Sequence, residues 1–124
     1  MIRQSKFFIL ILLTACAHSH KVSKIANGWI PLFNGHNLDG WTVKIYHHEV
    51  GDNFGNTFRA EDGMIKVRYD QYGDFNDQFA HLYYNEPLSY FDLKFDYRFT
   101  GEQQRGAPTY TLLNSGMMFH SQDP

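Results

Sequence analysis

The chain has 124 residues and a formal net charge of −2 at pH 7, which fits one domain and excludes the clustered basic surface of a nucleic-acid-binding protein. Aromatic residues make up 17% of the sequence, and this favours β-structure because Phe, Tyr and Trp are enriched in strands. Cys16 is the only cysteine, so no disulfide within the chain can hold the fold, and an apolar core must do so.

The first 15 residues have the architecture of a secretory signal peptide. Arg3 and Lys6 precede the apolar run 7–13, which is much shorter than the roughly 20 residues of a membrane-spanning helix. Residues 13–16, Leu-Thr-Ala-Cys, are similar to the lipobox of bacterial lipoproteins, in which the cysteine is lipidated and becomes the new N-terminus. We therefore expect a signal peptide over residues 1–15 and a membrane anchor at Cys16; a plain secretory signal is the alternative.

Residues 16–27 are expected to form the lipidated N-terminus and a short tether, because residues 18–24 are polar. Ala17 follows the cysteine, where an Asp would resemble the signal for retention in the inner membrane. The sequence therefore predicts an exported bacterial lipoprotein of the outer membrane, on its periplasmic face or at the cell surface.

From Gly28 onward, turn signals separate short apolar segments, a pattern typical of all-β proteins. Asp62-Gly63 is the clearest turn signal and predicts a hairpin. Period-two alternation is clearest over residues 90–100, where five aromatic or aliphatic side chains share one face. The predicted strands are 29–33, 41–46, the hairpin arms 58–60 and 64–69, 79–84, 90–100 and 117–120.

These strands favour a β-sandwich or jelly roll, with loops at 49–56 and 101–108 where binding residues are common. A jelly roll has about eight strands, and the predicted strands fall short of that number. We therefore expect residues 28–124 to be the N-terminal part of a longer domain.

The opening of this region is similar to that of a known bacterial family. Residues 28–41 contain Gly-Trp-Ile-Pro-Leu-Phe-Asn-Gly followed by Leu-Asp-Gly-Trp, which resembles the start of the 3-keto-disaccharide hydrolase family. Residues 58–65, 79–84, 96–98 and 114–119 resemble later segments of that family. Asp96 departs from the family, whose members more usually have Glu there, and the family domain continues beyond residue 124.

The resemblance implies a concanavalin-like jelly roll and a carbohydrate substrate already oxidised to a ketone at C3. A C3 ketone acidifies the proton on C2, so a base can remove it, the C1 group can leave, and water can then add. This chemistry needs a general base, a group that stabilises the enolate and an acid for the leaving group.

Three residues are the candidate catalytic groups. His81 lies on a predicted strand beside Phe79 and Tyr83, and we expect it to be the base; the alternative is a structural histidine on an aromatic face. His120 is a second candidate base or acid, or a surface histidine at a strand end. Arg98 is the candidate enolate stabiliser, unless it faces solvent in an ion-pair ladder.

Polar residues near these groups are candidates for substrate binding, although each also fits an ordinary turn, surface or core role. A divalent metal is possible, with His81, His120, Asp96 and Glu61 as ligand types, but the sequence has no tight metal-binding spacing. The candidate substrate-binding residues are Arg59, Glu61, Tyr83, Asp96, Asn114 and Ser115.

Three other functions stay open. A carbohydrate-binding module without catalysis would use aromatic residues such as Trp41, Tyr83 and Tyr84 as its platform. A conventional glycosidase would need two carboxylates flanking the bond, and no cleft-facing Glu-x-Asp pattern is present. A structural surface lipoprotein would have no site at all.

Overall fold

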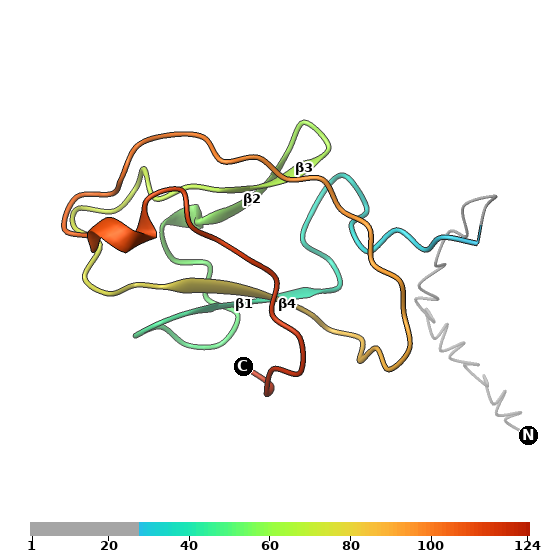
Figure 1. The fold of residues 1–124 in the computed structure, drawn as a ribbon. Helices are drawn as coiled ribbons and strands as arrows, with labels where there is room; N and C mark the ends of the chain where they lie inside the picture. The colour runs from blue at the N-terminus through green and yellow to red at the C-terminus, as the bar shows by residue number, and fades with distance from the viewer. Residues whose placement is uncertain (1–27) are drawn as a thin grey trace, which may run out of the picture. The chain divides into compact units, whose positions relative to one another are not determined.

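The computed structural model describes residues 28–124, of which Pro31–Pro124 form one unit (Figure 1). The signal peptide, Cys16 and the tether lie outside the described residues, and their roles stay predictions. In chain order the elements are β1 (Trp41–Ile45), η1 (Phe54–Asn56), β2 (Phe58–Glu61), β3 (Met64–Val67), β4 (Ala80–Tyr84) and η2 (Thr109–Thr111), where η marks a 3-10 helix. Because regular structure in the described part is otherwise strand, the predicted all-β class is confirmed. Within residues 28–124 no helix is long and apolar enough to cross a membrane.

The strands β2 and β3 form an antiparallel hairpin whose turn is Asp62-Gly63. Both turn residues have positive φ, 53° and 71°, as a type I′ turn requires, and the pair Glu61↔Met64 closes the hairpin. Glycine adopts positive φ without steric cost, and Asp is among the residues that tolerate it best. The predicted hairpin is confirmed, although β3 ends at Val67.

The strand β1 pairs antiparallel with β4, which comes much later in the chain (Figure 1). The register runs from Trp41↔Tyr84 to Ile45↔Ala80, and it confirms the strands predicted over 41–46 and 79–84 to within one residue at the ends. Each sheet has two strands, so the backbone pairing alone does not make either sheet stable, and packing between them must contribute.

The core lies where the apolar faces of the two sheets meet. Val43 and Ile45 of β1 and Phe58 of β2 are buried together, and Ile45 is fully inaccessible to solvent. Partly buried side chains complete this cluster. They are Leu38, Ile65, Ala80 and Leu82.

A second buried group lies around Tyr72 and includes a hydrogen bond between two buried hydroxyl groups. The hydroxyl groups of Thr57 and Tyr72 lie 2.7 Å apart, and Thr57 is fully buried, so the hydrogen bond satisfies both polar groups. Gly55 has φ +59°, and a Cβ there would lie 2.6 Å from Cε1 of Tyr72. Only glycine therefore fits at this position without displacing the tyrosine ring.

The predicted strands 29–33, 90–100 and 117–120 do not form, and the structure corrects the sequence here. A strand needs a hydrogen-bonded neighbour, and no ladder among the described residues pairs with any of these segments. The aromatic side chains of residues 90–100 are largely exposed, and Phe95 and Tyr97 stack on each other with centroids 5.6 Å apart. The alternation of apolar and polar residues therefore indicates that residues 90–100 could form a strand, but it does not identify a strand with which they would pair.

Candidate functional site

The outward face of the β1–β4 sheet carries a row of polar and aromatic side chains. Val43 and Ile45 turn into the core, so strand alternation turns Thr42 and Lys44 to the other face. The register places Lys44 directly opposite His81 and Thr42 directly opposite Tyr83. This face therefore brings together two residues predicted from the sequence, His81 and Tyr83, whose ring centroids are 6.4 Å apart.

A first cavity of about 330 Å³ opens on this face and is lined by Lys44, Tyr46, Phe79 and His81. The backbone N–H of Tyr46 donates to the Phe79 carbonyl at 2.9 Å, which continues the β1–β4 pairing by one step and fixes the two aromatic residues side by side. The cavity thus combines a basic imidazole, an ammonium group and two aromatic rings.

The turn after β1 holds Lys44 in place. The Nζ atom of Lys44 donates to the backbone carbonyl of His48, in the same turn that follows the strand. The His48 ring contacts Asp52 through Nδ1 at 3.2 Å and Gln78 through Nε2 at 3.2 Å, and it stacks on Phe54 with centroids 4.2 Å apart.

Neither Lys44 nor His48 was among the site residues predicted from the sequence. The alternation of residues 41–46 could have placed Lys44 on the outward face, but no local signal connects His48 to Gln78, which lies in the segment before β4. Only the β1–β4 pairing brings these two side chains together.

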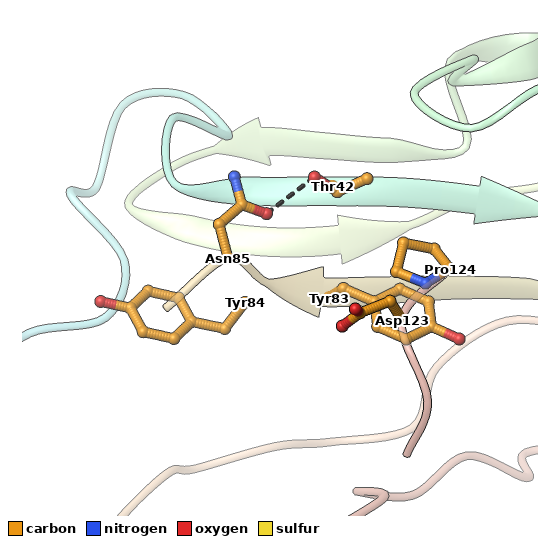
Figure 2. A pocket seen from close by; sticks show the side chains of 6 residues that line it. All are labelled: Thr42, Tyr83, Tyr84, Asn85, Asp123 and Pro124. Atoms are coloured by element: carbon orange, nitrogen blue, oxygen red, sulfur yellow. Dashed lines mark hydrogen bonds between the residues drawn. The ribbon is translucent and has the colours of Figure 1, made fainter. Parts of the chain in front are cut away.

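A second cavity of about 220 Å³ lies further along the same face. The hydroxyl of Thr42 donates to Oδ1 of Asn85 at 2.7 Å, and Figure 2 shows the amide nitrogen of Asn85 turned away from Thr42. The residues that line this cavity are Thr42, Tyr83, Tyr84, Asn85, Asp123 and Pro124.

Two predicted substrate-binding residues, Arg59 and Glu61, take part in ion pairs on and beside the β2–β3 hairpin. Arg59 binds the Asp70 carboxylate through two guanidinium nitrogens and donates from Nε to the Asn56 carbonyl at 2.7 Å. The Oε2 atom of Glu61 lies 3.4 Å from Nζ of Lys66 and 3.4 Å from a guanidinium nitrogen of Arg68. Neither residue lines the two cavities, so the structure gives Arg59 and Glu61 structural partners in the hairpin.

The remaining predicted residues, Asp96, Arg98, Asn114, Ser115 and His120, are exposed and lie in irregular segments. None of these five residues lines either cavity described above. Nor does the structure gather the metal ligand types considered from the sequence: within residues 28–124, no three His, Cys, Asp or Glu side chains cluster as a metal site would require.

The hairpin network makes a testable contribution to acid stability. The side-chain hydrogen bond from Arg59 lowers the pKa of Asp70, so the folded chain binds this proton more weakly than the unfolded chain, whose Asp pKa is about 3.9. The ion pair therefore stabilises the fold fully at pH values above the unfolded pKa of Asp70. This stabilisation is lost as the pH falls through the lower pKa of Asp70 in the folded chain. We expect Asp70→Asn to lower the urea midpoint at pH 7, by a small amount because Asp70 is exposed to solvent. At pH 3 the urea midpoints of the variant and the native chain should lie closer together. An equal difference at both pH values would contradict this assignment.

These features define a small all-β domain with an open, aromatic-lined polar face on one sheet. The family model described as the 3-keto-alpha-glucoside-1,2-lyase-like domain matches residues 28–124. The chain therefore belongs to this family, and the jelly-roll assignment rests on that membership. No curated protein and no solved structure matches the chain.

Proposed function

We propose that this domain hydrolyses 3-keto-α-glucosides by proton abstraction at C2, with His81 as the general base. The observation that supports the proposal most directly is the pair formed by His81 and Lys44, which are register partners across β1 and β4 and line one cavity. Family membership supports the substrate class, a keto-glucoside. The position of His81 on a strand supports its role as a fixed base.

The first step transfers the C2 proton of the sugar to a ring nitrogen of His81. A neutral imidazole is a suitable base because one of its ring nitrogens carries a lone pair that can accept a proton. His81 is exposed on the open face, so a sugar ring can approach it directly. Negative charge then accumulates on the C3 oxygen, which becomes an enolate.

Lys44 supplies positive charge next to that oxygen. Its ammonium group has three N–H donors, of which one reaches the His48 carbonyl. An ammonium held in place by this contact stabilises the enolate as it forms, without reorganising at the moment of reaction. The rings of Tyr46 and Phe79 give the apolar faces of the sugar a surface to pack against.

The enolate then expels the C1 substituent, whose oxygen leaves with the C1–O electron pair and takes a proton from a water molecule. The hydroxide that remains adds to C1 of the resulting enone, and the imidazolium of His81 returns its proton to C2. The sum of these steps is one water consumed for one glycosidic bond broken.

The test compares two substrates that differ only at C3. We expect the full chain to cleave methyl 3-keto-α-glucoside and to leave methyl α-glucoside intact, because only the ketone acidifies the C2 proton. Released methanol is measured for both. Equal rates on the two substrates would favour a conventional glycosidase, and binding without cleavage of either would favour a carbohydrate-binding module.

A further inference from the structure

We propose that residues 90–100 are an interaction surface for a second copy of this chain, and that the two copies pair there as antiparallel strands about a two-fold axis at Phe95. The inference is independent of the proposed function, since none of these residues lines either cavity. It assigns a role to the segment with the clearest alternation in the sequence, which includes Asp96 and Arg98.

The backbone of this segment has no hydrogen-bonded neighbour. Residues 91–100 contain no helix, turn or bend, and none of them has positive φ. Figure 1 shows the segment as an unpaired trace coloured amber to orange. None of the backbone hydrogen bonds among residues 28–124 involves residues 90–100. Their N–H and C=O groups are therefore available to a strand from another molecule, as they are at the edge of a sheet.

The aromatic side chains of the segment already share a face. The ring centroids of Phe95 and Tyr97 lie 5.6 Å apart, and those of Tyr97 and Phe99 lie 5.4 Å apart. Contacts between residues two positions apart are typical of an extended chain, in which every second side chain points the same way. The three side chains are between 42% and 71% exposed, so their rings can contact those of a paired strand.

The charges on the opposite face identify the partner as a second copy. In an antiparallel pair centred on Phe95, Asp92 lies opposite the partner's Arg98, and Lys94 lies opposite the partner's Asp96. Two-fold symmetry repeats both pairs, so every charge of the segment meets an opposite charge. Within one copy, none of the ion pairs among residues 28–124 uses these four side chains. The surface is therefore complementary to itself.

The same charges disfavour neighbouring registers. Sliding the antiparallel pair by two residues places Asp92 opposite the partner's Asp96 in one direction, and Lys94 opposite the partner's Arg98 in the other. Sliding by one residue places the aromatic face of one copy on the charged face of the other. A parallel pair in register places every charge opposite itself, and a parallel pair offset by two residues is head-to-tail and does not close. The pattern therefore favours one closed, symmetric dimer.

Sedimentation equilibrium of the full chain measures this dimer. We expect the native chain to associate as its concentration rises and to stop at two copies. Asp92→Lys and Arg98→Asp each place like charges opposite one another at both symmetric positions, so each should raise the dimer Kd by about tenfold or more. Glu49→Lys reverses an exposed charge outside the segment, so it is the matched control and should leave the Kd unchanged. A native chain that stays monomeric up to about 1 mM overturns the proposal.

Two rescue experiments separate strand pairing from loss of the fold. The double variant Asp92→Lys/Arg98→Asp exchanges the two charges and should regain the native Kd. An equimolar mixture of the two single variants should form a mixed dimer, because both symmetric positions then pair opposite charges. Failure of both rescues overturns the proposal, and so does association that charge reversal leaves unchanged. A monomer whose residues 90–100 are protected from hydrogen exchange also overturns it, since another part of the same chain would then cover them.

Discussion

Replacing His81 by alanine is expected to lower kcat on methyl 3-keto-α-glucoside by roughly 10²–10⁴-fold, the range that a general base contributes. Lys44 and the aromatic rings of the first cavity stay in place in this variant, so we expect KM to change much less than kcat. Released methanol under saturating substrate measures kcat, and initial rates at low substrate give kcat/KM. Parallel loss of kcat and kcat/KM would indicate an interaction made in the transition state.

The same variant should fold normally. His81 is exposed on its strand, and the β1–β4 ladder that includes it is formed by backbone groups that the substitution leaves unchanged. We therefore expect the urea midpoint to move little, since surface substitutions usually change stability by less than about 0.5 kcal/mol. His36→Ala, at an exposed histidine outside both cavities, is the matched control and should retain full turnover. An unfolded His81→Ala chain would identify His81 as a structural residue, and a folded chain with native turnover would exclude it as the base.

The parts of the fold that sequence predicted correctly are those specified by neighbouring residues. The β2–β3 hairpin needs two positive φ angles in succession, and Asp62-Gly63 provides them locally. The apolar alternation in β1 likewise assigns Val43 and Ile45 to the core before any partner strand is known. Local chemistry was enough for both elements.

Residues 90–100 show what local chemistry omits. Their alternation is the clearest in the chain, yet Phe95 is half exposed and the segment has no strand neighbour among residues 28–124. Alternation specifies which face of a strand becomes buried, whereas pairing depends on a second segment whose position the pattern does not contain. The same limit applied to His48, whose contact with Gln78 depends on the pairing of β1 with β4.

The candidate site was predicted in part for the same reason. His81 and Tyr83 share a face because they are two residues apart on one strand, and sequence placed both. Arg59 was predicted to bind substrate because of its residue type. In the structure its guanidinium group donates hydrogen bonds to the Asp70 carboxylate and the Asn56 carbonyl. Lys44 lies opposite His81 because of the register between β1 and β4, which are far apart in the sequence. Residue types alone do not specify that register.

The largest expected loss of stability comes from truncating Ile45 to alanine. Ile45 is fully buried between the two sheets, so the variant loses the transfer free energy of the deleted atoms and leaves a cavity, at a cost of about 2–5 kcal/mol. Small domains are stabilised by roughly 5–15 kcal/mol in total, and a core with few buried side chains has little capacity to compensate.

Urea unfolding followed by Trp fluorescence measures the effect, with Ile45→Val as a graded variant and Val50→Ala as an exposed control. We expect a loss of about 0.5–1.5 kcal/mol for Ile45→Val. The control should change stability by less than about 0.5 kcal/mol. This order of effects follows if β1 joins the two sheets into one core, because a side chain at the junction supports both. Equal, small effects for all three variants would mean that the two sheets do not depend on a shared core. The site on the outward face of β1 would then lack the rigid support that positions Lys44 opposite His81.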